Sequence, residues 1–228
     1  MKAPTLRGPG QRVISWPPMA GVDRSGGCSG AWQRGRYRER VLLRDGRSVL
    51  LRPAHHRDAA LLQSFFAELS PRSRLLRFHG AVNGLSDAAA RTLSTQVASR
   101  HVALVALADG PDGLPELCAE ARYAVDEDLD GDEAEFGIAV ADEWQQLGLG
   151  HALLTRLAIH ARANGFSRLR GSVMAGNEPM LALLQALGAE LRGHAAEVRG
   201  TIPLLAPGVA ARRHHRRVPD VHPNRATS

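Results

Sequence analysis

The 228-residue chain has no apolar run approaching the roughly 18 residues that a membrane-spanning helix requires. Its first residues carry scattered charges and lack the continuous apolar segment of a secretory signal. Only two cysteines occur, Cys28 and Cys118, and they are too few for a disulfide framework and too far apart for a metal-binding motif. We therefore expect a soluble, cytoplasmic protein with no membrane partner and no metal site.

Acidic residues are scarce at both ends of the chain, and this decides how the net charge of +6 is interpreted. Residues 1–40 contain eight Lys/Arg against two Asp/Glu, and residues 205–228 contain five against one. The total of +6 therefore leaves residues 41–204 with a formal charge of −4. Because the basic excess lies outside the central region, nucleic acid is not the expected partner.

Both ends also lack hydrophobic periodicity. Residues 1–38 are rich in Gly and Pro, and residues 206–228 are rich in Arg, His and Pro. Such compositions are typical of segments that cannot bury enough apolar surface to fold. The sequence thus predicts a disordered basic leader (1–38), one domain (39–205), and a disordered basic tail (206–228).

Within the central region, the hydrophobic pattern predicts an α/β (α+β) domain. Apolar runs on either side of Asp45-Gly46 indicate a β-hairpin over residues 41–54. Further strands are predicted at 101–108, 117–125, 134–140 and 167–174, with two strand-like runs after Gly188. Helices are predicted at 57–69, 71–78, 87–95, 151–164 and 179–187. This order implies a mixed sheet with helices on both faces.

The segment between the strand at 134–140 and the helix at 151–164 contains Gln-Gln-Leu-Gly-Leu-Gly, residues 145–150. Its two glycines let the backbone approach a ligand closely, and the free N–H groups of the following helix favour an anion such as a pyrophosphate. A tight connection without a ligand is the alternative. The loop does not match a nucleotide-binding P-loop, because His151-Ala152 follows in place of Lys-Ser/Thr. It does not match the dinucleotide fingerprint either, because Leu153 replaces the third glycine.

The Gln-x-x-Gly-x-Gly of residues 145–150 follows a strand that ends at Val140, and a helix led by Asn177 comes after the next strand. Together these features, within residues 75–190, resemble the acetyl-CoA signature and the Asn-led helix of the GNAT acetyltransferase superfamily. The resemblance implies one GNAT-like domain with a mixed, mostly antiparallel sheet of six to seven strands. It also implies acetyl-CoA as the acetyl donor and cofactor.

The same resemblance assigns the residues that contact the cofactor. Backbone amides of one continuous segment would hold the pyrophosphate: Gln145, Gln146, Leu147, Gly148, Leu149, Gly150 and His151. The pantetheine arm would run along Ile138, Ala139 and Val140, in a gap where two strands separate. Asn177 would contact the cofactor nearby, although Asn is also a favoured helix N-cap.

A carboxylate near the acetyl group could accept the proton that an amine must lose before it attacks. The resemblance assigns this role to Glu135, whose alternative reading is an exposed acid among Asp130, Asp132 and Glu133. The sequence departs from the family pattern at two places. Leu184 stands where many relatives have a Tyr that protonates the thiolate, and Gln146-Leu147 replace the usual Gly and basic residue of the loop.

Residues 70–80 resemble a Ser-x-x-Ser-x-x-x-Arg-Phe segment of bacterial protein-lysine acetyltransferases, matched by Ser70, Ser73, Arg77 and Phe78. This implies a protein lysine as acceptor, with Arg77 and Phe78 in contact with it. A helix end with a packing aromatic is the simpler explanation of that pair. The sequence leaves two other functions open, acetylation of a small-molecule amine and acyl-CoA binding without catalysis.

Overall fold

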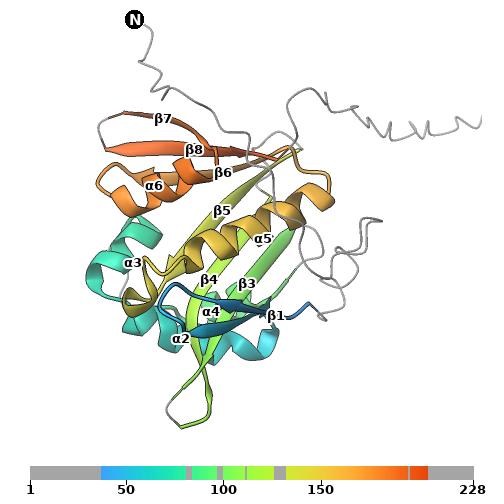
Figure 1. Ribbon diagram of the computed structural model, residues 1–228, viewed down its shortest axis with the longest axis vertical. Helices are drawn as coiled ribbons and strands as arrows, with labels where there is room; N and C mark the ends of the chain where they lie inside the picture. The colour runs from blue at the N-terminus through green and yellow to red at the C-terminus, as the bar shows by residue number, and fades with distance from the viewer. Residues whose placement is uncertain are drawn as a thin grey trace, which may run out of the picture.

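The computed structural model describes residues 37–80, 84–96, 100–110, 112–125, 132–194 and 196–204. These residues form one mixed sheet with helices on both faces (Figure 1). The predicted basic segments 1–38 and 206–228 lie outside the described residues, apart from residues 37 and 38. Among the helices described, none is both long and apolar enough to cross a membrane.

The chain enters the sheet through the predicted hairpin, formed by β1 (Glu39–Leu42) and β2 (Ser48–Pro53). Gly46 has a φ of 87° in the connecting turn, a conformation that favours glycine, and its N–H bonds to the Leu43 carbonyl at 3.1 Å. The Asp-Gly pair of the sequence therefore marks the turn correctly. The hairpin tip extends beyond the sheet edge toward the loop that precedes α5 (Figure 1).

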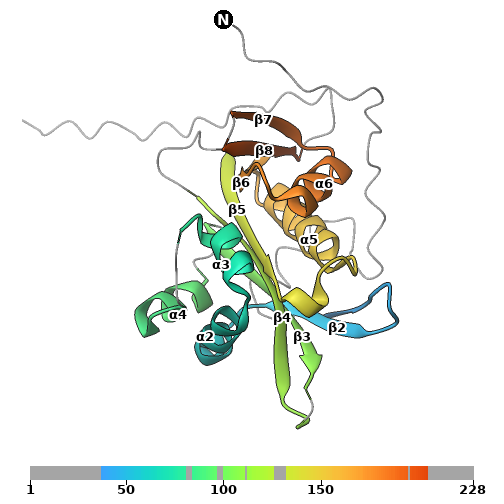
Figure 2. The same cartoon turned by 90° about the vertical axis from the view of Figure 1, so that its left-hand side faces the viewer.

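Three helices follow the hairpin and cover one face of the sheet (Figure 2). They are α2 (Ala59–Glu68), preceded by a short 3-10 turn, η1 (His56–Asp58), then α3 (Pro71–Phe78) and α4 (Asp87–Ser94). Ser70 and Ser86 cap α3 and α4 by accepting the N–H groups of Ser73 and Ala89, each at 3.2 Å. Phe65, Phe66 and Leu69 are buried in a core cluster on this face.

The centre of the sheet consists of β3 (His101–Asp109), β4 (Pro115–Ala124) and β5 (Glu133–Val140). A 3-10 turn, η2 (Asp142–Trp144), leads into α5 (Leu149–Ala163), which crosses the opposite face of the sheet. Leu153, Leu154 and Leu157 of α5 are fully buried in the larger core cluster. The helix predicted at 151–164 thus packs its apolar face on the sheet.

The sheet is completed by β6 (Arg168–Met174), β7 (Glu190–His194) and β8 (Glu197–Pro203), with α6 (Glu178–Ala186) after β6. The strand order is β1-β2-β3-β4-β5-β6-β8-β7, and only β5 and β6 pair in parallel. The sheet is therefore mixed and mostly antiparallel, as predicted. The predicted count of six to seven strands is wrong, because the described sheet has eight: both hairpin strands and both runs after Gly188 join it.

The parallel pair β5–β6 separates partway along its length. Its register contains three pairs, the last of them Glu135 with Arg170, although β5 continues to Val140 and β6 to Met174. Beyond Glu135, one edge of β5 is therefore not paired with β6. This is the strand separation expected from the sequence, and it opens at the carboxyl ends of β5 and β6, where α5 and α6 begin.

Candidate active site

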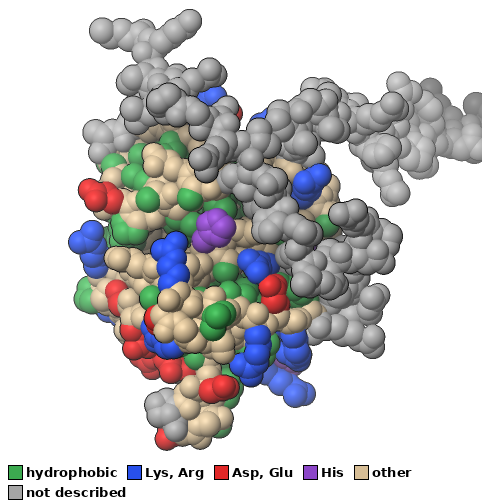
Figure 3. Space-filling model, viewed as in Figure 1, with side chains coloured by type: hydrophobic (Ala, Val, Ile, Leu, Met, Phe, Trp, Pro, Cys, Tyr) green, Lys and Arg blue, Asp and Glu red, His purple; other side chains and the backbone are tan. Residues whose placement is uncertain are grey.

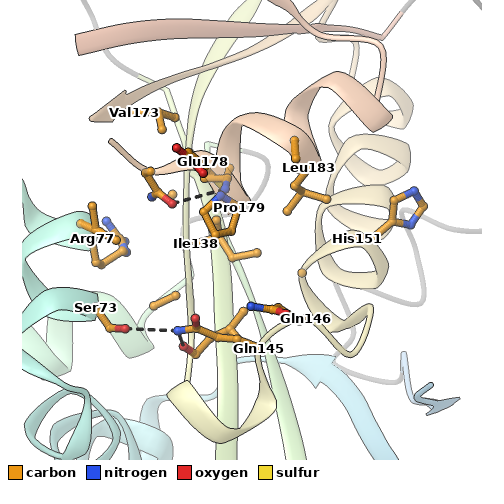
Figure 4. Close-up of a pocket in the computed structure, with 18 of the residues that line it drawn as sticks. Ser73, Arg77, Ile138, Gln145, Gln146, His151, Val173, Glu178, Pro179 and Leu183 are labelled. Carbon is orange, nitrogen blue, oxygen red and sulfur yellow. Dashed lines mark hydrogen bonds between the residues drawn. The ribbon is translucent and has the colours of Figure 1, made fainter. Parts of the chain in front are cut away.

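A pocket of about 1200 Å³ occupies this separation. Figure 4 shows Ser73 and Arg77 of α3 on one side, His151 and Leu183 of α5 and α6 on the other, and Gln145 and Gln146 at one end. Most of the site residues expected from the sequence line it: Arg77, Phe78, Glu135, Ile138, Ala139, Val140, Gln145, Gln146, Gly148, Gly150, His151 and Asn177. Segments as far apart in the chain as Arg77 and Asn177 thus meet at one cavity.

The loop from residue 145 to 151 presents unpaired amide groups at the start of α5. Within the described part of the chain, the N–H groups of residues 146–151 donate no hydrogen bond, and the next one, Ala152 N–H, bonds to the Gly148 carbonyl at 3.0 Å. Gly148 has a φ of 92° and provides no side-chain cap. Unpaired amides together with the helix dipole form an anion site, so the loop fits a pyrophosphate.

Not every side chain of the loop faces the pocket. Leu149 is buried, and Leu147 packs against the larger core cluster, so only their backbone amides are available to a ligand. Gln146 adopts a φ of 61°, a left-handed conformation that costs a non-glycine residue free energy. A glycine at this position would adopt the same conformation without that cost.

Asp142 connects the loop to α3 and was not singled out from the sequence. Its carboxylate accepts the Ser70 N–H at 2.9 Å, the Ser70 hydroxyl at 2.8 Å and the Ser73 hydroxyl at 2.7 Å. Burial would raise the pKa of Asp142, but these hydrogen bonds lower it below its usual range. Gln145 donates to the Ser73 hydroxyl and the Val140 carbonyl, each at 3.1 Å. The two serines therefore hold the loop in place.

Asn177 caps a helix and lies at the pocket. It is the N-cap of α6, because its Oδ1 accepts the Met180 N–H at 3.3 Å, and it also lines the pocket. Among the described residues its side-chain NH₂ group has no acceptor, which leaves that group available to a ligand. The neighbouring Glu178, Pro179 and Leu183 also line the pocket and were not predicted.

Glu135 differs from the other acids near it. Glu133 is buried and forms ion pairs with Arg168 and with Arg170, the latter at 2.6 Å. Glu135 is exposed and lines the pocket, and no described residue forms a hydrogen bond or ion pair with its carboxylate. Among the described residues, Glu135 is thus an uncommitted carboxylate, one without a hydrogen-bond or ion-pair partner, at the point where β5 and β6 separate.

Arg77 belongs to a buried charge network under the pocket. Its guanidinium lies 3.8 Å from the fully buried Glu120, which accepts Arg122 Nε at 2.5 Å. Burial lowers the pKa of Arg77, while the charges of Glu120 and Glu135 act in the opposite direction. Arg77 Nε and Glu120 Oε2 are buried without a hydrogen-bond partner in the described structure. The neighbouring Phe78 packs against Phe66 with ring centroids 5.1 Å apart, so it is a packing aromatic that also lines the pocket.

Leu184, which replaces the expected Tyr, is fully buried and does not line the pocket. A Cβ built on Gly200 would come within 2.5 Å of Leu184 Cδ1, so the leucine fills the space above that glycine. Among the described residues that line the pocket there is no Tyr, Cys or Lys. The described lining therefore offers no Tyr, Cys or Lys side chain that could protonate a thiolate.

Known proteins with a similar sequence and fold are acetyltransferases. The model of the acetyltransferase (GNAT) family matches residues 74–189. An acetyltransferase of Pseudomonas aeruginosa is 34% identical over 146 residues, which are 64% of this chain and 77% of the relative. The GNAT domain of S. lividans PAT superposes with a TM-score of 0.66 at 28% identity, covering 73% of this chain and 96% of that domain. A phosphinothricin acetyltransferase of Sinorhizobium meliloti, solved with acetyl-CoA, shares the fold at 23% identity, with a TM-score of 0.60 and coverage of 76% and 97%.

Proposed function

Because the chain belongs to the GNAT acetyltransferase family and uses acetyl-CoA as its acyl donor, we propose that it acetylates a lysine side chain of a protein, with Glu135 as the general base. The observation that carries this proposal is the uncommitted Glu135 carboxylate beside the separated edge of β5. Acetyl-CoA supplies an acetyl thioester there. Glu135 accepts a proton from the ammonium group of the acceptor, directly or through a water molecule, and so produces the neutral amine. The amine nitrogen attacks the thioester carbonyl, the C–S bond breaks as the C–N bond forms, and the leaving CoA thiolate takes up the second amine proton through water.

The residues of the pocket fit the donor at three points. The unpaired amides of residues 146–151 match a pyrophosphate, and the β5 edge from Ile138 to Val140 offers backbone groups to an amide-containing arm. The side-chain NH₂ of Asn177 can donate to the same arm. Glu135 lies near the start of β5, and the loop follows the end of this strand. A donor with its pyrophosphate at the loop and its arm along β5 therefore has its acetyl end near the Glu135 carboxylate.

Two observations support a protein lysine as the acceptor. The central residues 41–204 carry a formal charge of −4, which suits a basic substrate surface. The segment from Ser70 to Phe78 follows the pattern of bacterial protein-lysine acetyltransferases. Its two serines bind Asp142 and so hold the loop of residues 145–151, called the donor loop below.

Release of the CoA thiol tests the proposal when it is measured against a panel of acceptors. The panel contains folded proteins with exposed lysines, lysine peptides, polyamines and free amino acids. Turnover with a protein acceptor and mass-spectrometric location of the acetyl group on a lysine Nζ are expected. Turnover confined to a small amine would overturn the acceptor assignment, and binding of acetyl-CoA without turnover on the whole panel would overturn the proposed catalysis.

A further inference from the structure

The donor loop of this chain has no cation of its own. Residues 145–150 are Gln-Gln-Leu-Gly-Leu-Gly, and the side chain of Leu147 packs against the core. Unpaired backbone amides favour a pyrophosphate by hydrogen bonding and by the partial charge of the helix end. These amides carry only partial positive charges, whereas a diphosphate also favours a side chain with a full positive charge. A cation from another part of the chain would complete the site.

The tip of the β1–β2 hairpin brings Arg44 to this loop. The Arg44 N–H bonds to the Leu147 carbonyl at 3.2 Å, and Nη1 bonds to the Gln146 carbonyl at 3.4 Å. A Cβ built on Gly148 would lie 3.8 Å from Arg44 Nε, which places the guanidinium directly over that glycine. Arg44 also lines the pocket. In the space-filling view, arginine side chains lie over the region where Figure 1 places this hairpin (Figure 3).

A second arginine of the same turn fixes the hairpin to the loop. The Arg47 guanidinium lies 3.8 Å from the centroid of the buried Trp144 ring and donates to the Glu143 carbonyl at 2.9 Å. Asp45 pairs with it at 2.5 Å. Arg47 therefore holds the hairpin against the segment that precedes α5. Arg44, by contrast, has no carboxylate within 4.0 Å among the described residues. The two arginines of the turn have different functions: one anchors it, and the other carries an unneutralised charge to the pocket.

We infer that Arg44 binds the pyrophosphate of acetyl-CoA and supplies the positive charge that the loop lacks at Leu147. This inference rests on acetyl-CoA as the donor in the proposed function. A planar guanidinium presents several N–H donors, so it can hold the carbonyl of Gln146 and a phosphate oxygen together. The hairpin is thus part of the donor site.

Isothermal titration of the full chain with acetyl-CoA tests this inference. We expect Arg44→Ala to raise Kd about tenfold and Arg44→Lys to raise it less, because a charged hydrogen bond to phosphate is lost in the first case and kept as a point charge in the second. Arg91→Ala is the matched control, since this exposed arginine lies on α4 at the other face of the sheet. Its Kd is expected to equal that of the wild type. Circular dichroism checks that all variants are folded.

Donor analogues show which group Arg44 contacts. The effect of Arg44→Ala is expected to persist with acetyl-dephospho-CoA, which keeps the pyrophosphate, and to vanish with S-acetylpantetheine, which has no phosphate. An equal loss with S-acetylpantetheine would contradict the inference and make Arg44 a residue that only shapes the loop. A loss confined to acetyl-CoA would move the contact to the 3′-phosphate and overturn the assignment.

Acetyl-CoA binding by the wild type and by the Arg44→Ala variant distinguishes the role of Arg44 from the choice of donor. Wild-type affinity in the Arg44→Ala variant would refute the role of Arg44 and leave the proposed function intact. Absence of acetyl-CoA binding by the wild type would refute the donor assignment itself, and the role of Arg44 with it.

Discussion

The guanidinium of Arg77 lies directly against the backbone of Gly137, where a Cβ atom would come within 2.9 Å of Arg77 Cζ. Gly137 is two residues beyond Glu135 on β5, so the two residues share a face of the strand. The close approach of Arg77 to β5 therefore requires a glycine. It places a positive charge near the proposed general base, whose own charge opposes the lowering of the Arg77 pKa by burial.

Replacing Gly137 by alanine tests whether this packing matters for the acceptor. The new methyl group forces Arg77 away from β5, so we expect the KM for the acceptor to rise about tenfold, as for the loss of one charged contact. The Kd of acetyl-CoA should stay within about twofold of wild type. Gly80→Ala is the control, since its nearest neighbour would be 3.9 Å away. An unchanged acceptor KM in Gly137→Ala would show that the position of Arg77 is irrelevant to acceptor binding.

Removal of Glu120 is predicted to destabilise the fold strongly. Its carboxylate is fully buried between Arg122 and Arg77, so Glu120→Ala leaves two buried guanidinium groups without their counter-charge. The expected loss is about 3–5 kcal/mol in the free energy of unfolding, measured in urea. Glu190→Ala removes an exposed ion pair with Arg192 and serves as the control. Equal stability of the two variants would contradict the importance of the buried network.

Two substitutions in the donor loop are expected to change its backbone strain in opposite directions. Gly148 has a φ of 92°, so Gly148→Ala introduces strain of roughly 1–2 kcal/mol and should weaken acetyl-CoA binding as the loop distorts. Gln146 already adopts a φ of 61°, so Gln146→Gly relieves a similar cost and should preserve or slightly raise the melting temperature. Thermal melts and titrations of both variants measure this. A destabilising Gln146→Gly would mean that its side chain stabilises the loop.

The buried His160 predicts a loss of stability in mild acid. Burial lowers its pKa from 6.5 to about 4, so below pH 6.5 the unfolded chain takes up a proton that the folded chain does not. Stability therefore falls as the pH falls from about 6.5 to about 4, by roughly 3 kcal/mol, and this contribution then levels off. Urea unfolding at several pH values measures the slope, which should be smaller in His160→Gln. An equal slope in both proteins would assign the acid sensitivity to other groups.

Local signals in the sequence predicted most elements of the fold. Asp45-Gly46 marked the hairpin turn, and hydrophobic periodicity predicted helices at 87–95 and 151–164, where the structure has α4 and α5. These features depend on neighbours within a few residues. The strand count was underestimated because membership of a sheet depends on pairing between distant segments, and only the structure shows that β7 extends the sheet through β8.

The candidate site divides in the same way. The donor loop and Asn177 could be found because each is a short motif at the start of a helix. Arg44 could not, since nothing near it in the sequence indicates that the hairpin tip contacts a loop about 100 residues later. Asp142 follows the strand that carries Glu135, but its link to Ser70 spans 72 residues. The serines matched a family segment, whereas their contact with the donor loop emerges only from the tertiary structure.

Glu135 is the proposed general base. Its most direct test compares Glu135→Gln with Glu178→Gln, since both acids line the pocket and lack partners among the described residues. We measure the steady-state rate of thiol release with the best acceptor, and the Kd of acetyl-CoA for each variant. Glu135→Gln should lower kcat/KM by about 10²–10⁴-fold with an unchanged Kd, and Glu178→Gln should keep most of the activity. A fully active Glu135→Gln, or a loss confined to Glu178→Gln, would contradict the assignment.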